Sequence, residues 1–64
     1  MEAQRSRPDM YGLESLALTQ GGYFDRGDAH AHGIGDRLLH HYIRTGRFER
    51  VFPGVYRLAI APLS

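Results

Sequence analysis

The chain has 64 residues and a formal net charge of +1, which allows one small domain with a thin margin of stability. It contains no cysteine, so disulfides and thiolate metal sites are excluded, and we expect a protein of the reducing cytoplasm. The start lacks the basic and apolar regions of a secretory signal. Every apolar run is far shorter than the roughly 20 residues that a membrane helix needs.

The charges are unevenly distributed along the chain. Residues 1–36 carry three arginines and six acids, whereas residues 37–64 carry five arginines and only one acid, Glu49. The net charges of the two parts are therefore −3 and +4, and a basic half indicates a polyanionic partner. All eight basic residues are arginine, which binds phosphate or guanine with two parallel hydrogen bonds. A GC-rich genome that favours arginine codons explains this usage equally well.

The first predicted helix follows a polar stretch. Residues 1–8 are expected to form a disordered N-terminal arm. Asp9 has the character of an N-cap, apolar residues recur after it at helical spacing, and a glycine pair ends the segment. This pattern predicts a helix over about 9–20, in which Gly12 costs about 1 kcal/mol relative to alanine.

A short strand and a second helix are predicted next. Residues 23–24 are aromatic and follow glycines, so they can form a brief strand that pairs with a later hairpin. Asp25 and Asp28 have the spacing of a capping box. A weak helix over about 26–32 is expected to follow and to end at Gly33, the residue type that favours a left-handed terminus.

The third predicted helix has two distinct faces. Ile34 is expected to be an apolar plug between the helices, and Gly35 is expected to be the N-cap of the next helix. That helix is predicted over about 36–45 and stops at Gly46. Its apolar residues are Leu38, Leu39, Tyr42 and Ile43. Its polar residues recur at i, i+3, i+4 and i+7 and therefore form one exposed stripe, which consists of Arg37, His40, His41 and Arg44.

A hairpin is predicted after the third helix. The segment Phe48–Leu58 has strand composition on both sides of Pro53-Gly54, which fits a tight turn. Phe52 lies beside this turn and is the aromatic residue most expected to be exposed. The other aromatic side chains are mostly expected in the core, because a small domain needs large side chains to bury enough area: Tyr23, Phe24, Tyr42, Phe48 and Tyr56.

These elements together predict a mostly α fold with a small β part, a winged helix-turn-helix with three helices and a C-terminal hairpin wing over residues 9–59. In a helix-turn-helix the second helix of the unit enters the major groove. The alternative without a role in DNA binding is a solvated helix face, with hairpin charges that protect an edge strand from aggregation. The candidate residues for contact with double-stranded DNA are Arg37, His40, His41, Arg44, Arg47, Arg50 and Arg57.

Metal binding and catalysis have little support in the sequence. Neither the pair His30 and His32 nor the pair His40 and His41 places two rings on one helix face, so no metal or cofactor is expected. His30 is instead expected to be a partly buried residue of the second helix. The sequence has no nucleophile elbow, phosphate loop or paired carboxylates, so we expect no enzyme, no catalytic residue and no small-molecule substrate.

Several short motifs occur in a characteristic order along the chain. They are LESLA at 13–17, GGYF at 21–24, GI at 33–34, RLL at 37–39, RTGRF at 44–48 and PGVYRL at 53–58. With these motifs, residues 11–59 resemble the N-terminal winged-helix domain of AbiEi-type antitoxins, from bacterial type IV toxin–antitoxin systems. The resemblance implies binding to an operator and repression of the protein's own promoter, with the contact on the basic helix and wing residues named above.

The chain also departs from that family. Relatives commonly have alanine, leucine and a serine or threonine where Gly27, His30 and Gly35 stand, and each change weakens a helix. Relatives also continue into a larger C-terminal domain with the toxin-neutralising role, so residues 60–64 resemble a linker to a domain that these 64 residues do not contain. The resemblance therefore predicts DNA binding for this chain and does not predict antitoxin activity.

Several alternatives stay open at this point. The chain is a truncated gene product, a fragment of a larger antitoxin or nuclease-like protein, or a stand-alone regulator. It is also interpreted as a protein–protein interaction module that uses Phe52 and Tyr56 as an exposed anchor. For the DNA-binding interpretation, a second copy of the chain or the missing C-terminal domain is a further candidate partner. A remnant too unstable to fold is the third interpretation.

Overall fold

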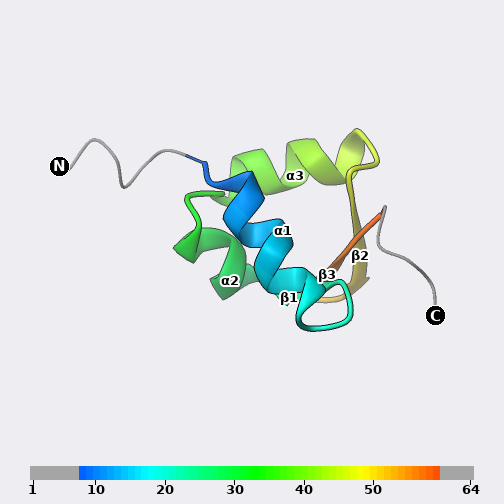
Figure 1. Ribbon diagram of the computed structural model, residues 1–64. Coiled ribbons are helices and arrows are strands. Elements are labelled where there is room, and N and C mark those ends of the chain that lie inside the picture. The colour runs from blue at the N-terminus through cyan, green and yellow to red at the C-terminus, as the bar shows by residue number, and fades with distance from the viewer. Residues whose placement is uncertain (1–7, 60–64) are drawn as a thin grey trace, which may run out of the picture.

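A computed structural model describes residues 8–59 of the 64 (Figure 1). The expected arm, apart from Pro8, and the expected tail at 60–64 lie outside the described residues. None of the helices in the described part is long and apolar enough to cross a membrane. The elements follow one another as α1 (Met10–Leu18), β1 (Tyr23–Asp25), α2 (Arg26–Ala31), α3 (Asp36–Arg44), β2 (Phe48–Phe52) and β3 (Val55–Leu58).

Helix α1 begins at the predicted cap and ends earlier than predicted. The Asp9 carboxylate accepts a hydrogen bond from the Gly12 amide at 2.9 Å. A methyl group at Gly12 would lie only 2.2 Å from a carboxylate oxygen of Asp9, so this glycine makes room for the cap. The helix ends at Leu18, where the Thr19 hydroxyl and amide both bond to the Leu16 carbonyl, at 2.6 and 3.0 Å, and close the last turn.

Helices α2 and α3 start and stop as the sequence predicts, to within a residue. The capping box is complete, with the Asp28 amide donating to Asp25 at 2.8 Å and the Asp25 amide donating to Asp28 at 3.1 Å. Gly33 follows α2 with φ of +79°, a value that glycine adopts without strain. Ile34 is fully buried, as predicted for the plug between the helices. Gly35 caps α3 without a side-chain hydrogen bond.

The three strands form one antiparallel sheet in the order β1-β3-β2. The predicted hairpin and the brief first strand are both confirmed, because β3 pairs with β2 on one side and with β1 on the other. Phe24 is opposite Tyr56 in β3, and Phe48 is opposite Leu58. The register of β2 shifts between Arg50 and Phe52, which is a β-bulge near the hairpin turn.

The core is built from one face of each helix and the inner face of the sheet. The Phe24 ring meets the Phe48 ring edge-on at 4.8 Å and lies 5.6 Å from the Tyr56 ring. Tyr56 is only 5% exposed, which confirms its predicted place in the core and contradicts the alternative in which it is a surface anchor. Tyr23 is placed differently than predicted, since its side chain is exposed. The buried hydrophobic residues are Leu13, Ala17, Phe24, Ala29, Ile34, Leu39, Phe48, Tyr56 and Leu58.

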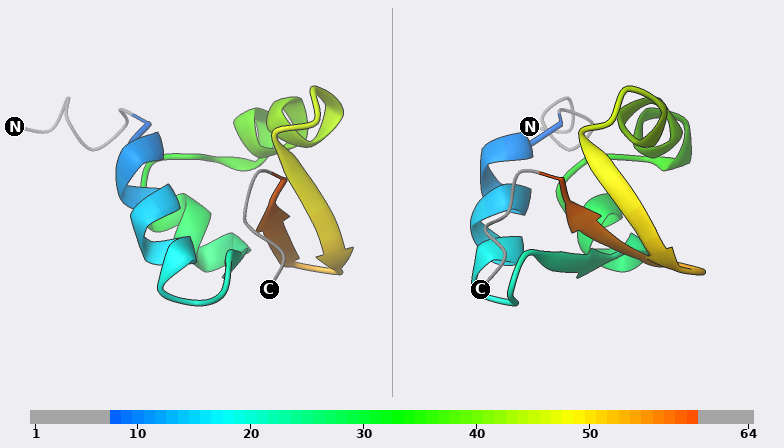
Figure 2. Two further views of the ribbon diagram at one scale, coloured as in Figure 1. Left: turned by 45° about the vertical axis from the view of Figure 1, so that its right-hand side comes forward. Right: turned by 90° about the vertical axis from the view of Figure 1, so that its right-hand side faces the viewer.

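The arrangement confirms the predicted winged-helix fold, three helices followed by a hairpin, with β1 as a third strand of the sheet. Both views in Figure 2 place α1 on one side of the molecule. Helix α3 and the turn between β2 and β3 lie on the other side. A ligand that approaches this side can therefore reach the helix and the hairpin turn together.

Candidate nucleic-acid interface

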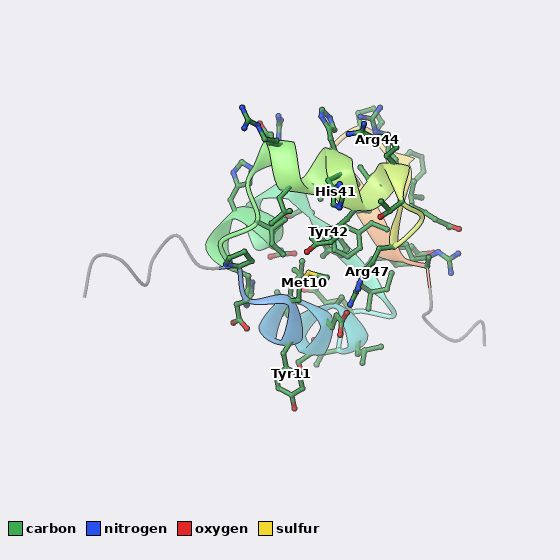
Figure 3. The ribbon with its side chains drawn as sticks, turned by 90° about the horizontal axis from the view of Figure 1, so that it is seen from above. Met10, Tyr11, His41, Tyr42, Arg44 and Arg47 are labelled. Atoms are coloured by element: carbon green, nitrogen blue, oxygen red, sulfur yellow. The ribbon has the colours of Figure 1, made fainter. Side chains whose placement is uncertain are left out.

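The exposed face of α3 carries two guanidinium groups and two imidazoles. Arg37, His40, His41 and Arg44 are all exposed, whereas Leu39 on the opposite side of the helix is buried. The spacing of the four residues within a helix of 3.6 residues per turn produces this grouping. Figure 3 shows Arg44 directed away from α1, beyond the outer side of α3. The structure thus brings together the four residues that the sequence placed on one stripe.

A hollow of about 550 Å³ opens along this face of α3. Gly35 lies at its end near the start of the helix, and Leu38 contributes an apolar part. The other lining residues are Arg37, His41 and Arg44, which supply hydrogen-bond donors. The partial positive charge at the amino terminus of α3 is offset by the Asp36 carboxylate in its first turn. The hollow has a mostly apolar surface with hydrogen-bond donors around it, so it is suited to a ligand that has both apolar and anionic parts.

Edge-on contacts between aromatic rings support α3. The Tyr42 ring meets the His41 ring at 5.4 Å and the Phe48 ring at 5.3 Å, both edge-on. Tyr42 and Met10 lie between α3 and α1 in Figure 3 and pack against the core. Contacts of this kind fix the rotation of α3 about its axis and so decide which of its residues face outward.

Arg47 is placed between α1 and the end of α3. Its guanidinium donates to the Glu14 carboxylate at 3.3 Å and lies over the Tyr42 ring, 5.8 Å from the ring centre (Figure 3). The pair joins residues 33 positions apart in sequence, which no local pattern reveals. Arg47 therefore has an intramolecular role in the free protein, and its predicted contact with DNA stays a prediction.

Arg57 is also engaged within the protein. Its guanidinium donates to Glu49 on the neighbouring strand at 2.7 Å, and its side chain is only 19% exposed. The hydrogen bond to Glu49, followed by the charge of Glu49, raises the pKa of Arg57 above its ordinary value. Arg50, by contrast, is exposed on β2 and belongs to no ion pair within residues 8–59.

An ionic cluster that sequence reasoning missed links α2 to α3. The guanidinium of Arg26 donates two hydrogen bonds of 3.1 Å to the two carboxylate oxygens of Asp36, and His30 Nε2 lies 2.9 Å from one of them. The hydrogen bond from Arg26, and then that from His30, lowers the pKa of Asp36 from 3.8 to about 2. Asp36 in turn raises the pKa of Arg26.

This cluster corrects the placement of His30, which is exposed rather than partly buried. The His30 imidazole lies on the surface of α2, where it binds the Asp36 carboxylate. The spacing of Arg26 and His30, four residues apart, was the available signal, since it places both on one face of α2. Within residues 8–59 no three potential metal ligands gather at one place.

The fold and this basic helix face define a winged-helix protein, and a comparison with known families identifies which kind. A family model described as "Transcriptional regulator, AbiEi antitoxin" matches residues 13–59. The match covers more than half of the 64 residues, so the chain belongs to the AbiEi antitoxin family of transcriptional regulators. The family comprises regulators and antitoxins rather than enzymes. No curated protein and no solved structure matches the chain.

Proposed function

We propose that this protein binds duplex DNA at its own promoter and represses its own operon, with residues 9–59 as the DNA-binding domain. The observation that carries the proposal is the exposed face of α3, where Arg37, His40, His41 and Arg44 lie on one side of a helix. Membership in a family of transcriptional regulators supports the same function.

Each residue of this face has a chemical role in the proposed complex. Arg37 and Arg44 lie two helical turns apart and bind phosphates or guanine edges, since guanidinium groups match both with paired hydrogen bonds. His40 and His41 donate to or accept from base edges in the major groove. Arg50 on β2 adds a contact to the backbone beside the groove.

Arg47 and Arg57 take a secondary part in this proposal. Both are already paired with acids in the free protein, Arg47 with Glu14 and Arg57 with Glu49. Their first effect is to hold α3 and the hairpin in place. Contact of either with phosphate requires exchange of the carboxylate partner for DNA, which adds less free energy than a contact by an unpaired arginine.

The experiment titrates the 64-residue protein against duplex DNA from upstream of its own gene, followed by fluorescence anisotropy at two salt concentrations. About five phosphate contacts predict a fall in affinity on the order of 100- to 1000-fold between roughly 50 and 200 mM salt. Arg44→Ala combined with Arg50→Ala is expected to weaken binding by at least about tenfold and to lower the salt slope by about 1 for each phosphate contact that is lost.

Tyr11→Glu combined with Ser15→Glu is the matched control, because it also lowers the net charge by two but changes exposed residues of α1, on the opposite side of the molecule (Figure 2). Its affinity for DNA should stay close to that of the wild type. The proposal fails if the wild type does not bind at low salt. It also fails if the Arg44 and Arg50 substitutions weaken binding no more than this distant charge change.

A further inference from the structure

The turn of the β2–β3 hairpin exposes apolar side chains. Phe52 is 65% exposed, and its neighbours Val51 and Pro53 are also exposed. Burial of a phenylalanine ring stabilises a folded protein because the ring leaves water. A ring that stays exposed on a projecting turn therefore contributes little to folding. Exposed apolar residues gathered at one place mark a surface for binding.

The path of β2 explains why these side chains leave the core. Phe48 at the start of the strand is buried, but every later residue of β2 is exposed. The bulge between Arg50 and Phe52 places an extra residue opposite β3, which interrupts the alternation of inward and outward side chains. The second half of β2 therefore extends beyond the core and carries the Phe52 ring outward.

The charges around the turn indicate the kind of partner. Arg50 precedes Phe52 by two residues and has no ion pair within the described residues. Glu49, the acid on this strand, is already neutralised by Arg57 at 2.7 Å. The turn thus combines an available cation with an exposed aromatic ring. DNA offers both partners for this combination, phosphates for the cation and flat base faces for the ring.

The turn is also held in a fixed relation to α3. The backbone amide of Arg26 donates to the Gly54 carbonyl at 3.0 Å, while the Arg26 side chain binds Asp36 in the first turn of α3. One residue therefore joins the hairpin turn to α2 and α3. Because the turn and α3 lie on the same side of the molecule (Figure 2), one DNA duplex can contact both.

We infer that the hairpin turn is an apolar wedge, in which the Phe52 ring enters the minor groove and inserts between two stacked base pairs next to the site of α3. The inference rests on the proposed function, since α3 brings the wedge to the duplex. Insertion of an apolar side chain unstacks a base step and bends the DNA, so specificity comes partly from how easily the flanking sequence deforms. Flexible pyrimidine–purine steps are the expected sites.

The absence of tryptophan from the chain allows a direct test. The variant Phe52→Trp carries the single tryptophan of the protein, and insertion between base pairs is expected to quench its fluorescence strongly when upstream duplex DNA is added. Tyr11→Trp is the matched control, since Tyr11 is 82% exposed on α1 and points away from α3 (Figure 3). Its fluorescence should change little on the same DNA.

A second measurement uses the wild-type chain and Phe52→Ala with DNA labelled at both ends. The wild type is expected to shorten the end-to-end distance through bending, and Phe52→Ala to abolish the shortening and weaken binding by about tenfold, as loss of base–aromatic stacking does. Thermal melts of each variant check that it folds, and Phe52→Trp retains the ring if Phe52→Ala does not fold.

The outcomes separate this inference from the proposed function. If the wild type binds DNA with the expected salt dependence but the Phe52→Trp fluorescence is not quenched, the wedge is overturned and the proposed function stands. Unchanged DNA affinity and bending in folded Phe52→Ala also overturn the wedge and leave a protein partner as the occupant of the turn. If the wild type does not bind DNA at all, both fail.

Discussion

Asp36 connects the two helices of the helix-turn-helix through its carboxylate. It is the first residue of α3 and accepts hydrogen bonds from Arg26 of α2, while His30 lies beside the same group. The carboxylate also faces the positive end of the α3 dipole. These interactions favour the charged form of Asp36, which is why the pKa of its carboxyl falls to about 2 in the folded protein.

The lowered pKa of Asp36 predicts a loss of stability in acid. The ordinary pKa is 3.8 and the folded value is about 2, so the unfolded chain binds the proton more tightly. The contribution of Asp36 to stability is therefore present above pH 3.8 and is lost as the pH falls to about 2. Asp36→Asn should lower the melting temperature near neutral pH and flatten its dependence on pH across this window.

Arg26→Lys is the variant that separates geometry from charge. Lysine keeps the positive charge but cannot bind both carboxylate oxygens with a planar fork, so it should retain only part of the acid dependence. Thermal melts by circular dichroism at several pH values measure all three proteins. An Asp36→Asn protein whose melting temperature falls between pH 4 and 2 as steeply as that of the wild type would contradict the explanation.

At the scale of elements, local residue patterns determine where the helices begin and end. Asp9, the capping box and the glycines after α2 and α3 all act over a few residues, so the sequence was sufficient to predict them. The helix that is shortened most is α1, because the Thr19 hydroxyl and amide donate to the Leu16 carbonyl before the predicted end. The residue at which α1 ends depends on the turn that leads into β1.

Gly46 at the end of α3 permits a specific prediction. Its φ is +88°, a conformation that costs a residue with a side chain about 1 kcal/mol or more, although open space surrounds it. Gly46→Ala should therefore lower the free energy of unfolding by about 1 kcal/mol. Gly35→Ala is the matched control, because Gly35 has φ of −77° and equally open surroundings.

Urea melts at constant pH measure both glycine variants. The alanine at Gly35 loses a few tenths of a kcal/mol as a poorer N-cap and regains a similar amount through a stiffer unfolded chain, so its net effect should be small. If the two substitutions destabilise the protein equally, backbone conformation is not the reason that glycine stands at position 46.

Side-chain contacts between distant elements were less accessible to sequence reasoning than the boundaries of the elements. Arg47 and Glu14 meet because α1 packs beside the end of α3, and nothing near either residue in sequence records that contact. The exposure of Phe52 depends on the bulge, which changes the alternation of β2 against β3. The exposed stripe on α3, in contrast, follows from helical spacing alone and was predicted.

At the scale of the whole molecule, a few large side chains hold the fold together. Phe24, Phe48 and Tyr56 form an aromatic cluster between the sheet and the helices, with ring centres 4.8 and 5.6 Å apart. A small domain buries a lower fraction of its surface than a large one, so each of these rings accounts for a large part of the total stability.

Phe24→Ala should leave the protein largely unfolded at 25 °C. Removal of a buried phenylalanine costs about 3–5 kcal/mol, which is comparable with the whole stability of a chain this size at roughly 0.05–0.15 kcal/mol per residue. Tyr11→Ala removes an exposed ring of similar size and should change the stability by no more than about 0.5 kcal/mol. Far-ultraviolet circular dichroism and thermal melts distinguish the two. A cooperative melt of Phe24→Ala close to that of the wild type would show that the cluster is not the main source of stability.

The bulge in β2 also affects how copies of the protein meet one another. β2 lies at the end of the strand order, so its outer edge has backbone donors and acceptors that β3 does not use. An added strand from a second copy needs a regular row of these groups, and the shift between Arg50 and Phe52 interrupts the row. A hairpin that exposes Val51 and Phe52 would otherwise be a template for sheet extension and aggregation. The irregularity lets the protein keep an apolar turn in water while hindering the growth of that sheet into larger assemblies.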